Sequence, residues 1–258
     1  MTTWDLGLGG AVVLVTGGAR GVGAGISAAF AEVGARVVVC GRSEPDSLSG
    51  AEFLPCDVRE PEQVERLVDR ITERHGRLDV VVNNAGGAPF AEAARASARF
   101  HEKVVALNLL APLTVARCAN TVMQQQDSGG VIVNVGSVSG GRASPGTASY
   151  GAAKAGLVNL TASLAVEWAP KVRVVAIAAG MVRTEQAHLH YGDEAGIAAA
   201  GRTVPLGRLA EPAEIGACAV FLASPKAAYV SGTTLTVHGG GEVPAFLAAS
   251  NAQHEERA

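Results

Sequence analysis

The chain has 258 residues, of which 48% are apolar and 17% charged, so it is long enough for one large α/β domain or two small ones. Its net charge of −3 and isoelectric point near 6.1 exclude the basic balance that attracts nucleic acid or an anionic membrane surface. No uninterrupted apolar run reaches the ~20 residues of a membrane span, and the N-terminus lacks a signal peptide's charged start and hydrophobic core, so we expect a cytoplasmic protein.

A glycine-rich turn follows the first predicted strand. Residues 11–15 (AVVLV) form a β-branched run, TGGARGVG occupies 16–23, and an alanine-rich helix is expected over 24–33. Glycines let the backbone bend tightly and approach a phosphate, while the N-terminus of the helix behind them supplies free N–H groups and partial positive charge. We interpret the turn as a nucleotide-binding element. An ordinary connection between a strand and a helix is the alternative.

The second predicted strand, 36–40, bears on the choice of cofactor. In an adenosine-ribose site a carboxylate at the end of this strand binds the ribose 2′-hydroxyl, whereas an Arg accommodates a 2′-phosphate. Gly41 stands at the acidic position, Arg42 follows it, and Arg20 in the glycine-rich turn adds a second positive charge. Each Arg alone resembles a solvated surface residue. Together with the missing carboxylate they favour NADP(H), with NAD(H) as the alternative.

Strands and helices alternate through the next part of the chain. Residues 51–56 read as a third strand that ends at Asp57, 62–75 as an amphipathic helix, and 78–82 as a fourth strand that runs into the sequence NNAG at 83–86. Sustained alternation of this kind predicts a doubly wound parallel sheet with helices on both faces.

A proline interrupts the longest predicted helix, 97–126, whose apolar residues recur at steps of three and four. Pro112 has no N–H, so the carbonyl of Asn108, four residues earlier, loses its helical partner. A polar residue with a freed carbonyl inside an apolar helix is unusual. The interruption is either an ordinary kink or a functional one.

Three residues in the middle of the chain together suit proton exchange with a substrate. Ser137 follows the predicted strand 131–135, and Tyr150 and Lys154 share one face of the predicted helix 150–168 because they are four residues apart. A nearby ammonium favours phenolate, so Lys154 is expected to lower the pKa of Tyr150 from ~10. Tyr150 then exchanges a proton with an alcohol or carbonyl whose oxygen Ser137 holds. Because a YxxxK pair alone carries no function, this interpretation depends on the rest of the chain.

The last third of the chain completes one domain. No linker or repeat divides the sequence, so we predict a single dinucleotide-binding domain over 1–258 with its core over about 8–240 and a mobile tail over 241–258. The elements expected here are a strand over 172–178, an irregular and then alanine-rich segment over 181–205, a helix over 211–222 and a strand over 233–237.

Four cysteines, Cys40, Cys56, Cys118 and Cys218, form no CxxC pair and join no His/Cys cluster. A reducing cytosol disfavours disulfides. We therefore expect free, mostly buried thiols and no metal site.

The assembled motifs resemble those of the short-chain dehydrogenase/reductase family over about residues 8–240. Their joint occurrence in order is far more specific than any one of them. The resemblance implies a Rossmann-type sheet, usually of seven strands, and hydride transfer with a nicotinamide cofactor. The motifs are TGGARGVG at 16–23, Asp57, NNAG at 83–86, Asn108, Ser137 and YGAAK at 150–154.

The resemblance also implies four catalytic residues. Tyr150 is the expected acid/base, Lys154 contacts the nicotinamide ribose, Ser137 binds the substrate oxygen, and Asn108 holds a relay water. Family members commonly form tetramers or dimers through the two long helices, so a homotetramer or homodimer is the expected assembly.

Further residues are implied to bind the cofactor. Asp57 holds the adenine amino group, and Asn83 and Gly86 support the cofactor and the central strand. The expected cofactor-binding set is Gly17, Ala19, Arg20, Gly21, Val22, Gly23, Gly41, Arg42, Asp57, Val58, Asn83, Ala85, Gly86, Tyr150, Lys154, Gly180, Val182 and Thr184.

One motif departs from the family pattern. Behind the sixth strand the family usually has Pro-Gly, where this chain has Ala179-Gly180. Gly180 and Thr184 still permit contacts to the carboxamide of the cofactor. Without the fixed φ of proline, the turn is expected to be looser.

These observations predict an NADP(H)-dependent oxidoreductase that acts on a carbonyl or secondary alcohol of a small molecule. An NAD(H)-dependent alcohol dehydrogenase and a non-catalytic dinucleotide sensor are the alternatives, and a sensor has no need of Ser, Tyr and Lys together. The sequence does not identify the substrate. Arg142 and Arg95 are candidate contacts for an anionic group such as a coenzyme A thioester, or are solvated loop residues, and 185–203 is the expected lid.

Overall fold

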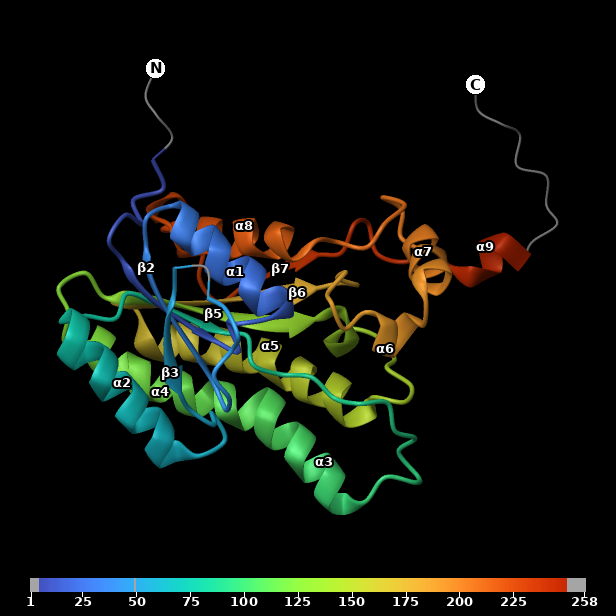
Figure 1. The fold of residues 1–258 in the computed structure, drawn as a ribbon, viewed down its shortest axis with the longest axis horizontal. Helices are drawn as coiled ribbons and strands as arrows, with labels where there is room; N and C mark the ends of the chain where they lie inside the picture. Colours follow the sequence, from blue (N-terminus) through green and yellow to red (C-terminus); the bar gives the residue numbers. More distant parts are fainter. Residues whose placement is uncertain (1–4, 49, 250–258) are drawn as a thin grey trace.

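Seven parallel strands form one sheet in a computed structural model that describes residues 5–48 and 50–249 (Figure 1). Their order is β3-β2-β1-β4-β5-β6-β7. The β-branched runs supply the strands because valine and isoleucine pack well on a pleated surface that is buried on both sides. The strands are β1 (Val12–Thr16), β2 (Arg36–Gly41), β3 (Glu52–Pro55), β4 (Val80–Asn83), β5 (Gly130–Ser137), β6 (Val172–Ala179) and β7 (Thr234–Val237).

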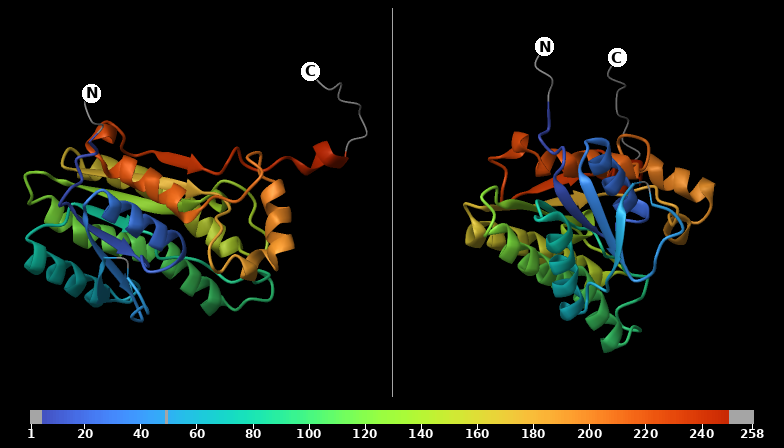
Figure 2. Two further views of the ribbon diagram at one scale, coloured as in Figure 1. Left: turned by 45° about the horizontal axis from the view of Figure 1, so that its top comes forward. Right: turned by 60° about the vertical axis from the view of Figure 1, so that its left-hand side comes forward.

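Helices cover both faces of the sheet, which confirms the doubly wound architecture (Figures 1 and 2). Alternate strand residues point to opposite faces: Val13 and Val15 pack with one helical layer, and Val12 and Leu14 with the other. The first layer consists of α1 (Gly21–Glu32) and α8 (Pro212–Ala223), and the second of α2 (Pro61–His75), α4 (Ala111–Met123) and α5 (Ala148–Trp168).

The long helix expected over 97–126 is divided into three segments. α3 (Ala98–Val105) is followed by a π-helical turn, η1 (Ala106–Leu110), and then by α4. The π-turn contains Asn108 and ends just before Pro112, which cannot continue an α-helical hydrogen-bond ladder because it has no N–H. The interruption read from the sequence therefore takes the form of a π-turn.

The same stretch, Ala98–Met123, has 26 residues and is long and apolar enough to cross a membrane. It carries charged side chains such as Lys103 and Arg117, while Val115 and Ala119 pack in the core against the sheet. It is a core helix of the fold, beside α2 and α5 (Figure 1).

Short helices from the C-terminal part gather at one end of the molecule. α6 (His188–Tyr191), α7 (Glu194–Arg202) and α9 (Ala245–Ala249) lie at the right of Figure 1. The segment expected to be irregular thus contains two helices. The 3₁₀ turns η2 (Val138–Gly140) and η3 (Pro225–Ala227) complete the element order.

The beginning of the predicted tail is tied down. The N–H of Val243 donates to the Thr203 carbonyl at 2.9 Å, and Glu242 forms an ion pair with Arg142 at 2.6 Å. These contacts hold the first residues of the predicted tail against the fold. The part of the tail beyond 249 lies outside the described residues.

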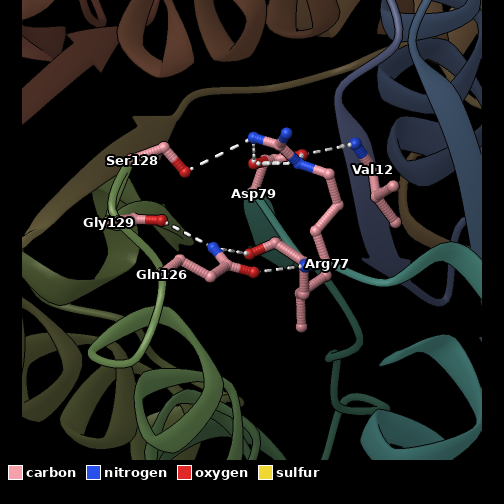
Figure 3. Close-up of polar contacts among 7 residues, drawn as sticks. Val12, Arg77, Asp79, Gln126, Ser128 and Gly129 are labelled. Carbon is pink, nitrogen blue, oxygen red and sulfur yellow. Dashed lines mark hydrogen bonds and ion pairs between the residues drawn. The ribbon is translucent and has the colours of Figure 1, made fainter. Parts of the chain in front are cut away.

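A side-chain network joins three strands at the amino edge of the sheet (Figure 3). Asp79, just before β4, accepts from the N–H of Val12 in β1 at 2.9 Å and from Arg77 Nε at 2.9 and 2.8 Å. Gln126, before β5, accepts from the N–H of Leu78 at 2.8 Å and donates to its carbonyl at 3.0 Å. These contacts satisfy backbone groups where β1, β4 and β5 begin.

We expect Asp79→Ala to lower the free energy of unfolding by about 1–3 kcal/mol, because the N–H of the buried residue Val12 loses its acceptor. Asp79→Asn is the matched control, since it keeps an oxygen acceptor and loses only the charge. Urea unfolding followed by circular dichroism measures both. Equal losses from the two variants would assign the effect to the ion pair with Arg77 instead.

Candidate active site

Ser137, Tyr150 and Lys154 converge at the carboxyl edge of the sheet. Ser137 is the last residue of β5 and pairs with Ala179 of β6, while Tyr150 and Lys154 lie one turn apart in α5. Ser137 lies close enough to Tyr150 to lower the pKa of its phenol. Lys154 Nζ lies 5.6 Å from the centroid of the Tyr150 ring. The strand end and the helix face expected from the sequence thus bring all three side chains into one place.

Burial controls the proton affinities of this group. Lys154 is 4% exposed, its Nζ donates to the Val135 carbonyl at 2.7 Å, and burial lowers its pKa to about 8. Burial raises the pKa of Tyr150 above its usual value, and Ser137 offsets only part of the rise. The expected lowering of the Tyr150 pKa by Lys154 is therefore wrong for this structure, because desolvation favours the neutral phenol.

Asn108 is fully buried in the π-turn and fixes the loop that follows β4. Its Oδ1 accepts from the N–H of Gly87 at 2.8 Å, and its Nδ2 donates to the carbonyls of Gly87 and Val104 at 2.9 Å each. A Cβ at Gly86 would lie 2.7 Å from Asn108 Oδ1 and 3.3 Å from Lys154 Nζ. Gly86 is thus the point where the NNAG loop, the π-turn and α5 meet.

The glycine-rich turn between β1 and α1 is bonded to the NNAG loop. Thr16 Oγ1 accepts from the N–H groups of Asn84 and Ala85 at 3.0 Å each, and Asn84 Nδ2 donates to the Thr16 carbonyl at 2.9 Å. A Cβ at Gly23 would lie 2.2 Å from the Gly17 carbonyl oxygen, so α1 approaches the turn this closely only with glycine there. Thr16 and Asn84 are positioning residues that the sequence reasoning missed, although both stand inside the quoted motifs.

A carboxylate lies at the N-terminus of α1. The N–H of Gly21 donates to the two carboxylate oxygens of Glu185 at 3.0 and 3.2 Å. Helix N-termini attract anions because their first N–H groups have no helical partners. The Glu185 carboxylate stands where such a turn holds a phosphate, so the turn fits the pyrophosphate of a dinucleotide, which has to displace Glu185. Sequence reasoning missed this contact because it joins residues 164 positions apart.

Two arginines lie at the adenosine end of the expected cofactor site. The hydrogen bond from Arg59, together with the charge of Arg42, lowers the pKa of Asp57, and Arg59 Nε lies 2.9 Å from Asp57 Oδ1. At the end of β2, a Cβ on Gly41 would meet Phe53 at 3.7 Å, an ordinary contact distance. Arg42 and Arg59 therefore lie near Asp57, and a Cβ at Gly41 would be accommodated. Arg59 was not among the expected residues.

Two of the expected cofactor-binding residues belong to the core. Val58 is 7% and Asn83 2% exposed. Asn83 Nδ2 donates to the Pro112 carbonyl at 3.1 Å and to Asn134 Oδ1 at 2.9 Å, so it ties β4 to α4 and β5. Arg20, by contrast, is the exposed N-cap residue of α1. Asn83 thus supports the central strand, as the resemblance implies, from inside the fold.

The loop after β6 reaches the glycine-rich turn. Val182 bridges to Ala210, and a Cβ at Gly21 would lie 3.4 Å from Thr184 Cγ2. Thr184 and Val182 therefore lie on the same side of the sheet edge as the turn, as a shared cofactor site requires.

Strand pairing holds the position where the family has proline. Ala179 is the last residue of β6 and pairs with both Ser137 and Val237. The N–H of Gly180 then donates to the Val237 carbonyl at 2.8 Å. The backbone at this turn is fixed by the ladder, so the looser turn expected from the sequence does not describe this structure.

Arg95 and the cysteines, also weighed from the sequence, have no contact with this cluster in the described residues. Within residues 5–48 and 50–249, no three His, Cys, Asp or Glu side chains come together as metal ligands. Arg95 pairs with Glu92 at 2.9 Å and its side chain is 84% exposed, so it is a solvated surface residue. All four cysteines are free, and three of them are buried.

Residues 17–242 match a family model described as enoyl-(acyl carrier protein) reductase. A short-chain type dehydrogenase/reductase of Sinorhizobium fredii is 36% identical over 241 residues, which cover 90% of this chain and 43% of that protein. This chain belongs to the short-chain dehydrogenase/reductase family. A 3-oxoacyl-[acyl-carrier-protein] reductase of Vibrio cholerae is 36% identical over 239 residues, 90% of this chain and 97% of that protein.

A solved structure agrees with this family membership. The aldohexose dehydrogenase of Thermoplasma acidophilum, in ligand-free form, matches with a TM-score of 0.87 and 28% identity over 96% of this chain and 98% of that one. As a short-chain dehydrogenase/reductase, the protein is an oxidoreductase that acts on a CH–OH group or a carbonyl with NAD(P)(H).

Proposed function

We propose that this short-chain dehydrogenase/reductase is a cytoplasmic, NADP(H)-dependent enzyme that interconverts a carbonyl and a secondary alcohol in a small molecule. The observation that carries the proposal is the convergence of Ser137, Tyr150 and Lys154 beside the glycine-rich turn. A sensor that only binds the dinucleotide has no use for this group of side chains.

Each of these side chains has a task that its position supports. Ser137, at the end of β5, donates a hydrogen bond to the substrate oxygen, and Tyr150 exchanges a proton with the same oxygen. The nicotinamide cofactor, when bound, supplies or accepts the hydride. Lys154 and Asn108 are the proposed relay for the proton of Tyr150, and both lie near Gly86.

The raised pKa of Tyr150 favours one direction of proton transfer. Burial keeps the phenol protonated at neutral pH. A protonated phenol can donate to the oxygen of a carbonyl as it is reduced, whereas alcohol oxidation needs the phenolate. We therefore propose carbonyl reduction as the favoured reaction near pH 7.

The surroundings of Gly41 support NADP(H). Arg42 follows this position, Arg59 lies beside Asp57, and no carboxylate ends β2 to repel a 2′-phosphate. Both arginines carry positive charge at any physiological pH.

We expect wild-type kcat/KM to be higher with NADPH than with NADH, and Gly41→Asp to reverse the preference. The new carboxylate would stand against the 2′-phosphate and accept from a ribose 2′-hydroxyl instead. Arg42→Gln should lower kcat/KM with NADPH and leave kcat/KM with NADH unchanged. Arg36→Gln, at the other end of β2, is the matched control. Steady-state assays with both cofactors and a panel of ketones decide this. Faster wild-type turnover with NADH contradicts the proposal, and cofactor binding without turnover of any ketone favours a sensor.

We also propose a homotetramer or homodimer built on the long helices. Apolar side chains on their outer surface are exposed, namely Leu110 (52%), Val158 (39%) and Val166 (81%). Burying such side chains between copies is favourable, at about 25 cal/mol per Å² of apolar surface. Analytical ultracentrifugation measures the assembly.

A further inference from the structure

A small cavity lies at the carboxyl ends of β5 and β6. It encloses about 230 Å³ and begins at Val138, the residue after Ser137, and at Gly180, the residue after β6. This volume is below the roughly 300–1,000 Å³ of pockets for drug-sized ligands, so the cavity suits a small molecule. Its other lining residues are Arg142, Met181, Val204, His238, Gly241 and Glu242.

An ion pair forms one side of this cavity. Arg142 Nη2 lies 2.6 Å from Glu242 Oε1, and the two side chains are 46% and 39% exposed. Arg142 comes from the loop after β5, and Glu242 from the segment after β7, 100 residues further on. Tyr191 of α6 lies close enough to feel both charges: burial raises its pKa, which Arg142 lowers and Glu242 raises further. The charges therefore face the space between the catalytic strand and the lid.

Three consecutive glycines direct Glu242 to this position. Gly239, Gly240 and Gly241 have φ values of +64°, +97° and +93°, which other residues rarely adopt. A Cβ at Gly240 would also lie 2.9 Å from Pro205 Cβ, and the N–H of Leu206 donates to the Gly239 carbonyl at 3.1 Å. The chain thus turns back against Pro205 and Leu206 just before Glu242, so the backbone conformation brings the carboxylate to Arg142.

We propose that Arg142 and Glu242 recognise hydroxyl groups of the substrate next to the reacting carbon, so that the enzyme acts on a small, uncharged polyhydroxylated compound such as a polyol or sugar. The carboxylate accepts from hydroxyl groups, and the guanidinium donates to hydroxyl oxygens. Because the pair is partly exposed, its members can reorient toward a ligand at little cost in stability.

The same pair disfavours an anionic substrate. Glu242 neutralises Arg142, which the sequence offered as a contact for a coenzyme A thioester, and it places a negative charge in the cavity wall. An anionic head group would have to break the ion pair and approach the free carboxylate. The inference rests on the proposed oxidoreductase function and adds the substrate class.

The test compares substrates that differ in hydroxyl groups and charge. Oxidation with NADP⁺ is measured for threitol, erythritol, hexoses and 2-butanol, and reduction with NADPH is measured for acetoacetyl-coenzyme A. The enzymes compared are wild type, Glu242→Gln and Arg142→Gln. The control variant is Glu65→Gln, which alters an exposed ion pair with Arg117. We expect the polyhydroxylated substrates to have the higher kcat/KM. Both cavity variants should raise their KM by about 10-fold, because the amide still forms a hydrogen bond but loses the charge that strengthens it. KM for 2-butanol and all values for Glu65→Gln should stay within about 2-fold.

The outcomes separate this inference from the proposed function. Turnover of 2-butanol or acetoacetyl-coenzyme A with no preference for hydroxylated substrates overturns the recognition role and leaves the oxidoreductase in place. An acetoacetyl-coenzyme A activity that Arg142→Gln abolishes assigns the arginine to an anion instead. If no compound turns over, calorimetric titration of the NADP⁺ complex with threitol and the hexoses still tests recognition: binding that Glu242→Gln weakens supports it, and the absence of binding overturns both proposals.

Discussion

Tyr150→Phe is expected to lower kcat by about 10²–10⁴-fold, the usual contribution of a general acid/base, while the fold and the affinity for cofactor are retained. Phenylalanine keeps the ring that packs near Lys154 and removes only the hydroxyl near Ser137. Within the cluster, the Ser137 hydroxyl is a weak acid and Lys154 Nζ donates to the Val135 carbonyl, so Tyr150 is the group suited to protonate the substrate oxygen.

A matched control makes this result interpretable. Tyr229→Phe removes a hydroxyl from a fully exposed tyrosine and should leave kcat unchanged. Steady-state turnover with NADPH, together with fluorescence titration of NADPH, separates chemistry from binding. A Tyr150→Phe enzyme with more than half of the wild-type kcat would exclude Tyr150 as the acid/base.

The strands of the sheet could be predicted because the residues of each strand are enough to mark it. A run such as VVLVT of β1 or VVVN of β4 is buried on both faces, so unbroken hydrophobicity marks the strand without any knowledge of its neighbours. The placement of Ser137, Tyr150 and Lys154 was equally local, since it follows from one strand end and one helical turn.

The electrostatics of the site could not be read from the sequence. Proximity of Tyr150 and Lys154 suggested an ammonium that lowers the phenol's pKa, but burial acts on both groups and dominates. Burial depends on how α5 packs against β5 and the NNAG loop, which is a tertiary property. The contacts of Glu185 with Gly21 and of Glu242 with Arg142 were hidden for the same reason, because each joins distant segments.

The π-turn could be predicted only in part from the sequence. Pro112 correctly marked a break in the helix, but proline alone does not distinguish a bend from a π-turn. What fixes the form is the Asn108 side chain, whose three hydrogen bonds to Gly87 and Val104 require the wider turn and the NNAG loop together.

Asn108→Leu should therefore harm both stability and turnover. Leucine leaves the Gly87 N–H and the Val104 carbonyl without the amide partner, at about 1–3 kcal/mol for a buried unpaired group. The NNAG loop then shifts against Lys154, and displacements of about 1 Å near a reacting centre cost on the order of 10²-fold in rate. Glu73→Leu, on the exposed face of α2, is the control for adding an apolar side chain to a helix.

Pro112→Ala tests the proton path separately. Alanine restores the N–H that an α-helical bond to the Asn108 carbonyl needs, without touching the Asn108 side chain. We expect slower turnover with little change in cofactor affinity, and a smaller loss than for Asn108→Leu, if a water between that carbonyl and Lys154 returns the proton to Tyr150. Rates at saturating cofactor and a high-resolution crystal structure check this. With no water between the Asn108 carbonyl and Lys154, the π-turn would act only by holding Gly87, and the proton of Tyr150 would have to come from solvent through the substrate cavity.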